Sequence, residues 1–129
     1  MNELSKPHRI NLSAMWRTDD DPGSSKVNLQ ELDWGSIDQT QLKQGPITFS
    51  RSFNRPTNLD EHSRVTLELT GLPVDTCCNF NGQEIGRCEG IVCEFDVTEL
   101  LISGQNRIQI EVRNLTGTKS PAGVVLILQ

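Results

Sequence analysis

The stretch that decides the fold is CNFNGQEIG at residues 78–86, followed by FDVTELL at 95–101 and GQNRI at 104–108. Asn81-Gly82 is the preferred dipeptide of a two-residue β-hairpin, because both central residues of a type I′ turn need positive φ. The segments on either side, residues 76–81 and 83–87, are therefore predicted to pair as antiparallel strands. Two more strands follow in the sequence, at residues 93–97 and 107–113, with a short turn between them.

Alternation of apolar and polar residues predicts the remaining strands. They are expected at residues 9–16, 47–53, 64–69, 93–97, 107–113 and 124–128. In the first of these, Ile10, Leu12, Ala14 and Trp16 share one side. Thr98 is placed to cap a single helical turn that ends near Gly104.

About eight short strands separated by turn signals, with no long amphipathic helix, indicate an all-β fold. We expect an antiparallel two-sheet jelly-roll sandwich that forms one domain over residues 1–129. The polar start and the Asp/Pro/Gly/Ser-rich run predict mobile segments at residues 1–8 and 18–26.

Composition narrows the possible partners. Twelve basic against seventeen acidic residues give a net charge of −5, and the sequence contains no basic run, which argues against nucleic acid as a partner. No stretch of about 18 apolar residues is present, so no membrane helix is expected. The polar N-terminal residues lack the apolar centre of a secretory signal, and we therefore expect a cytoplasmic location.

Metal and cofactor motifs are weak. Cys77, Cys78, Cys88 and Cys93 lack the paired spacing of zinc modules, so we interpret them as small apolar residues or half-exposed thiols. A Cys88–Cys93 disulfide is an alternative only if the chain is in an oxidising compartment. Asp19–Asp21 supply oxygen ligands of the kind calcium uses, but a solvated loop is the simpler interpretation. We predict no metal and no cofactor.

Five segments in order resemble the N-terminal sugar-binding, galactose-binding-like jelly-roll domain of family 2 glycoside hydrolases, the β-galactosidases, β-glucuronidases and β-mannosidases. They are FSRSFNRP (49–56), RVTLELTG (64–71), CNFNGQEIG (78–86), FDVTELL (95–101) and GQNRIQIEV (104–112). The resemblance covers about residues 10–128. It implies this fold and a non-catalytic, carbohydrate-binding-like module. The family's catalytic acids lie in a separate barrel that this sequence does not contain, so we expect no enzymatic activity.

Candidate binding residues are few because the chain has two Trp, four Phe and no Tyr. Trp16 and the four Phe have the parity of core residues, which leaves Trp34 as the aromatic that could stack on a sugar ring. Arg51 shares the parity of Phe49 and Phe53, so its charge must be paired or lie at the rim of the sandwich. Asn79 and Arg113, outward polar residues, complete the candidate carbohydrate-binding set of Trp34, Arg51, Asn79 and Arg113.

The fold does not choose among the functions that such a scaffold supports. Carbohydrate binding is the first hypothesis. An alternative is a protein-interaction or assembly module that binds a protein partner or forms a homodimer. A further alternative is a degenerate relative of a glycosidase with a structural role.

Overall fold

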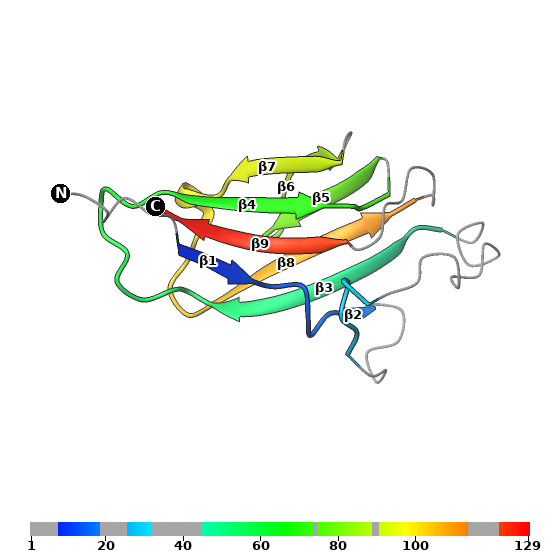
Figure 1. Ribbon diagram of the computed structural model, residues 1–129, viewed down its shortest axis with the longest axis horizontal. Helices are drawn as coiled ribbons and strands as arrows, with labels where there is room; N and C mark the ends of the chain where they lie inside the picture. Colours follow the sequence, from blue (N-terminus) through cyan, green and yellow to red (C-terminus); the bar gives the residue numbers. More distant parts are fainter. Residues whose placement is uncertain (1–7, 19–25, 32–44, 74, 89–90, 114–121) are drawn as a thin grey trace.

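The protein is an antiparallel sandwich of two sheets, described by a computed structural model (Figure 1). The structure describes residues 8–18, 26–31, 45–73, 75–88, 91–113 and 122–129. One sheet has the order β1 (His8–Asn11), β9 (Gly123–Leu128), β4 (Val65–Thr70), β7 (Val92–Asp96). The other has the order β2 (Arg17–Thr18), β3 (Ile47–Asn54), β8 (Gln105–Val112), β5 (Thr76–Phe80), β6 (Gln83–Cys88). The described residues contain no α-helix, and the predicted fold class is confirmed.

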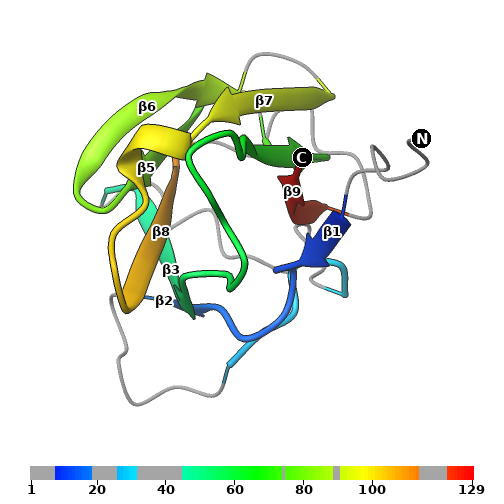
Figure 2. The same cartoon turned by 90° about the vertical axis from the view of Figure 1, so that its left-hand side faces the viewer.

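The core fills the space between the two sheets, which face each other when the molecule is viewed from its end (Figure 2). Alternate residues of the long strands β3, β4 and β8 enter it, as the sequence predicts. From β4 these are Val65, Leu67 and Leu69, and from β8 they are Ile108, Ile110 and Val112. The rings of Phe53 and Phe80 meet edge to face with their centroids 6.0 Å apart. Such alternation buries a continuous apolar layer, which is the main driving force for this fold.

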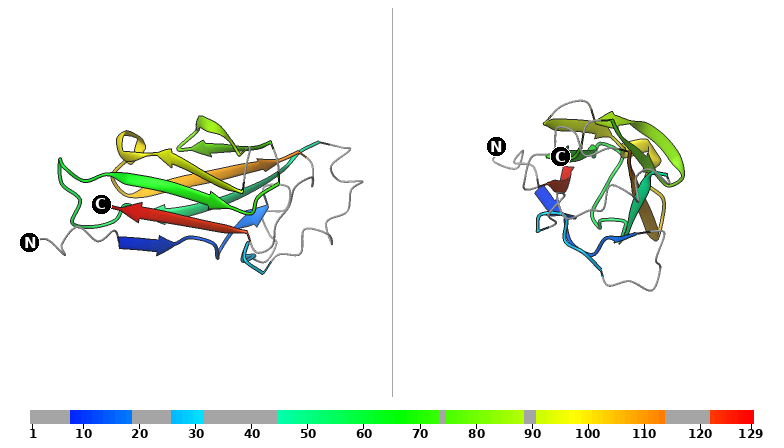
Figure 3. Two further views of the ribbon diagram at one scale, coloured as in Figure 1. Left: turned by 45° about the horizontal axis from the view of Figure 1, so that its top comes forward. Right: turned by 90° about the vertical axis from the view of Figure 1, so that its right-hand side faces the viewer.

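The strand predicted over residues 9–16 is wrong in one respect: the chain changes sheets within it. β1 pairs with β9, and β9 in turn lies between β1 and β4 (Figure 3). The chain then turns through Met15, whose φ is 69°, and β2 joins the other sheet. Trp16 is fully buried, as its parity predicts, and its indole nitrogen donates to the Leu12 carbonyl at 2.6 Å. Alternation therefore identified Leu12 and Trp16 as buried, but it missed the burial of Ser13 and the change of sheets.

The Asn81-Gly82 hairpin is confirmed, with φ of 51° and 84° at its two central residues. The Asn81 side chain also ties the hairpin to β8. Its amide nitrogen donates to Asn106 Oδ1 at 2.9 Å and to the Leu100 carbonyl at 2.8 Å, while its oxygen accepts from the Arg107 amide at 2.8 Å. The two asparagines of the predicted motifs thus hydrogen-bond to each other.

The single helical turn after β7 is present, but Thr98 is not its cap. The turn is a 3-10 helix over Thr98–Leu100, so Thr98 is its first residue. Asp96 Oδ1 accepts from both the Thr98 amide and its hydroxyl, at 3.0 and 2.6 Å. The Thr98 hydroxyl is turned toward β4, where it accepts from the Val65 amide at 2.8 Å. The cap prediction is wrong because the turn begins one residue earlier than expected, with Val97 at the N-cap position and no side-chain cap.

The adjacent cysteines Cys77 and Cys78 lie on opposite faces of β5, as strand geometry requires, yet both are buried. Cys78 belongs to the core between the sheets, together with Cys88. Burial raises the pKa of the Cys78 thiol to about 12 and also raises that of Cys88. No disulfide joins the four cysteines, all of which lie in the described residues.

Candidate functional site

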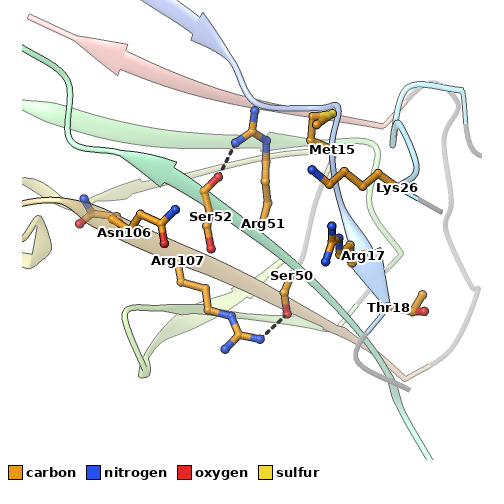
Figure 4. Close-up of a pocket in the computed structure, with 10 residues that line it drawn as sticks. Met15, Arg17, Thr18, Lys26, Ser50, Arg51, Ser52, Asn106 and Arg107 are labelled. Atoms are coloured by element: carbon orange, nitrogen blue, oxygen red, sulfur yellow. Dashed lines mark hydrogen bonds between the residues drawn. The ribbon is translucent and has the colours of Figure 1, made fainter. Parts of the chain in front are cut away.

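A polar pocket lies where β2 ends beside the longer strand β3, and we call it the edge pocket. Its volume is about 890 Å³, within the range of small-molecule sites. It is lined by Met15, Arg17, Thr18, Lys26, Ser50, Arg51, Ser52, Gln105, Asn106 and Arg107. Figure 4 shows where these side chains come from. Strand β2 and Met15 before it lie on one side, with Lys26 beside them, and β3 and β8 supply the others.

Unequal strand lengths create the edge pocket. β2 pairs with β3 only through Arg17–Ser50 and Thr18–Phe49, whereas β3 continues to Asn54 beside β8. Ser50 and Ser52 point to the outer face of the sheet because they alternate with buried Phe49 and Phe53. Arg107 lies opposite Ser52 on β8 and donates to the Ser50 hydroxyl at 3.1 Å.

Arg51 has the inward parity that the sequence analysis singled out, and it lies half-buried at the rim. Its Nε donates to the Ala14 carbonyl and its Nη1 to the Ser52 carbonyl, each at 2.7 Å. Partial burial lowers the pKa of the guanidinium. A guanidinium has five N–H donors. The two bonds therefore hold Arg51 in place while leaving three donors without a partner among the described residues.

Hydrogen-bond donors and acceptors dominate the described lining of the edge pocket. Hydroxyl, amide and guanidinium groups line it, and no Asp or Glu is among the described lining residues. Glycoside hydrolysis by the usual route needs a pair of carboxylates, and the described lining residues supply neither. Within the described ranges, no group of three or more His, Cys, Asp or Glu side chains is arranged to hold a metal ion.

The three described residues of the predicted binding set, Arg51, Asn79 and Arg113, do not come together in one site. Arg51 lines the edge pocket. Asn79 lies on the same sheet as Ser50, two strands away, with Gln109 between them in the same row. Arg113 lies just past the end of β8 and forms an ion pair with Glu111 at 2.7 Å. Trp34 and Asp19–Asp21 lie outside the described residues.

Sequence reasoning missed most of the edge pocket: Arg17, Lys26, Ser50, Ser52 and Arg107. Outward parity on a strand marks Ser50, Ser52 and Arg107 as exposed polar residues, and that signal was available. Their proximity depends on the register Ser52–Arg107 and Ser50–Arg17, which no local pattern gives. The basic side chains are scattered along the sequence and meet only in the folded chain.

The chain belongs to the glycosyl hydrolase 2 galactose-binding domain-like family, whose model matches residues 27–121. This match confirms the resemblance found in the sequence. No curated protein sequence matches the chain.

Solved structures with the same fold are glycosidases. An FMN-binding β-glucuronidase from F. prausnitzii L2-6 aligns over 95% of this chain with a TM-score of 0.71 and 21% identity. A β-D-glucuronidase from Dictyoglomus thermophilum aligns over 95% with a TM-score of 0.70 and 14% identity. A β-glycosidase from Bacteroides vulgatus aligns over 94% with a TM-score of 0.64 and 19% identity. At these identities the similarity shows the fold.

The present chain covers 22%, 28% and 20% of those three proteins, respectively. The match is thus to the accessory N-terminal domain of such enzymes. In the part of the chain that the structure describes, no helix is long and apolar enough to cross a membrane.

Proposed function

We propose that the chain is a non-catalytic carbohydrate-binding module that holds its sugar in the edge pocket. The observation that carries this proposal is the lining, in which the hydroxyls of Thr18, Ser50 and Ser52 lie around the partly satisfied guanidinium of Arg51. Hydroxyls and planar polar groups are the natural hydrogen-bond partners of sugar hydroxyls. Membership of a galactose-binding-like family and the glycosidase neighbours support a carbohydrate ligand.

A non-catalytic role is supported by the absence of carboxylates among the described residues of the lining. The family match supports it too, because it covers an accessory domain. Binding in a single open pocket is expected to be weak. A dissociation constant near 1 mM corresponds to about 4 kcal/mol, which a few hydrogen bonds can supply.

A pocket-filling variant tests the proposal. A panel of soluble glycans is first titrated against the whole chain, and the best binder is then titrated against Ser52→Trp. Ser52 is exposed and points outward, so an indole at this position occupies the pocket without entering the core. We expect at least tenfold weaker binding with an unchanged melting temperature.

The matched control is Thr48→Trp, on the same strand and the same face but outside the pocket lining. It should bind like the wild type. Equal loss in both variants, or no binding of any glycan at millimolar concentration, would contradict the proposal.

A second candidate function is assembly with a second copy of the chain through β7. This strand is at the edge of its sheet. Its first residue, Val92, is 55% exposed, and Ile91 just before it is 64% exposed. Exposed apolar edge strands are templates for pairing with another chain. Sedimentation equilibrium tests this: a dimer that Val92→Lys dissociates would favour assembly, and a monomeric wild type would exclude it.

A further inference from the structure

Positive charge gathers in the edge pocket of an acidic chain. Arg17, Lys26, Arg51 and Arg107 line it, which is four of the twelve Lys and Arg residues in a chain of net charge −5. No carboxylate is found among the described lining residues. Like charges brought together in one pocket repel, and a negatively charged ligand relieves this repulsion.

The cations that line the pocket differ from several of those outside it in their ion pairs. Outside the pocket, Arg9 pairs with Glu68, Arg64 with Asp96 and Arg113 with Glu111. Inside it, Arg17, Lys26 and Arg51 pair with no carboxylate of the described ranges. Within those ranges, no carboxylate competes with an anionic ligand for these three cations.

Of these three cations, Arg51 is the one whose side chain is already held in place for binding an anion. Its two 2.7 Å bonds to the carbonyls of Ala14 and Ser52 fix the guanidinium, so little conformational entropy is lost when a ligand binds. Half-burial reduces solvent screening around it, which strengthens its attraction for an anion. A planar guanidinium also matches the geometry of a carboxylate or a sulfate.

Aromatic stacking does not contribute among the described lining residues, where Met15 is the one large apolar side chain. Affinity and orientation must then come from polar and charged contacts. A neutral sugar would use the hydroxyl and amide groups but leave the charge of the pocket uncompensated.

We infer that the edge pocket binds an anionic saccharide, a sugar that carries a carboxylate or a sulfate group, with Arg51 holding the anionic group and Arg17 and Lys26 adding attraction. The serine and threonine hydroxyls bind the sugar itself. This inference rests on the proposed function and goes beyond it by naming the class of ligand.

The experiment compares sugars that differ at one carbon. The sugars are methyl β-glucoside, its 6-sulfate and methyl β-glucuronide, which differ only at C6, and the corresponding galactose series. Each is titrated against the whole chain by calorimetry at low and at high ionic strength. We expect the carboxylated or the sulfated form to bind at least about tenfold more tightly than the neutral form, because charge-assisted hydrogen bonds are stronger than neutral ones. We also expect this advantage to shrink in high salt.

The outcomes separate the two proposals. Neutral and anionic forms binding equally would overturn the inference and leave the proposed function standing. Binding by none of the sugars would overturn both. Inorganic sulfate binding as tightly as the sulfated sugar would show a simple anion site and contradict the part that assigns a saccharide.

Charge variants test whether the preference for the anionic sugar comes from the cations of the edge pocket. Arg17→Gln combined with Lys26→Gln removes two exposed cations and leaves the bonds of Arg51 intact. This variant should lose at least about fivefold in affinity for the anionic form, and that loss should exceed any loss for the neutral form. The control Arg87→Gln changes the charge of an exposed residue on β6, outside the pocket, and should have little effect. An equal loss in the control would overturn the inference.

Asp19, Asp20 and Asp21 directly follow Thr18 in the sequence. Their replacement by Asn removes negative charge next to a pocket-lining residue, so affinity for the anionic sugar should stay the same or rise. A loss of affinity in this triple variant would contradict the inference, because it would mean that carboxylates hold the sugar.

Discussion

At the scale of single residues, Asn106 shows how a motif residue stabilises the fold. It is fully buried, and its Oδ1 accepts from Asn81 Nδ2 and from the Ile102 amide, each at 2.9 Å. Asn106→Ala would leave both donors without this acceptor. We expect the free energy of unfolding to fall by about 2 kcal/mol, the usual cost of buried unsatisfied groups, in urea denaturation.

Asn79→Ala is the matched control, since it removes a half-exposed amide from the neighbouring strand. It should cost less than about 1 kcal/mol. Similar losses in the two variants would show that the Asn81–Asn106 pair has no special role.

Gly86 is a second residue whose identity is required by its surroundings. Its φ is 154°, and a Cβ there would lie 2.5 Å from Phe95 Cε1. Gly86→Ala must therefore displace an aromatic ring as well as strain the backbone, and we expect a loss of about 2 kcal/mol in a thermal or urea melt. At Gly45 the φ is similar, 142°, but no atom of the other described residues lies within 4 Å of the added Cβ, so Gly45→Ala should lose less. The reverse order would contradict the packing explanation.

At the scale of elements, the hairpin between β5 and β6 depends on Gly82, whose φ is 84°. A β-branched residue is strained at positive φ, so Gly82→Val should lower the free energy of unfolding by about 1 kcal/mol or more. Gln83→Val, at the next exposed position and within the strand, should be nearly neutral. An unchanged melting curve for Gly82→Val would be incompatible with the turn.

Local patterns predict most strands because alternation reports burial, and burial is what each strand shares with its sheet. The buried positions of β4 and β8 and the inward Phe49, Phe53 and Phe80 all follow from it. Alternation does not report which sheet a strand joins. The run through Met15 therefore looks continuous in sequence although β1 and β2 belong to different sheets.

The same limit applies to the candidate site. Parity identified Arg51 as unusual, and the structure explains it by two backbone carbonyl partners. Arg17 and Lys26 carry no such signal, because a lone cation on an exposed segment is ordinary. Only the pairing of β2 with β3, of β3 with β8 and of Trp16 with Val27 brings these cations beside Arg51 and Arg107.

At the scale of the whole molecule, we predict that the chain does not hydrolyse glycosides. The described lining of the edge pocket contains no carboxylate, and the family match is to an accessory domain. Aryl β-galactosides, β-glucuronides and β-mannosides should show no turnover above buffer in a release assay. Turnover that disappears when one carboxylate of the chain is replaced would contradict this prediction.

The central claim is that sugar binds in the edge pocket, and an NMR titration tests it most directly. The backbone amides of an isotope-labelled chain are followed while an anionic methyl glycoside is added to millimolar concentration. We predict saturable shifts at Ser50, Ser52 and Arg107, with little change on β6 and β7, which lie away from the pocket. Shifts confined to β6 and β7, or no shifts at all, would contradict the claim.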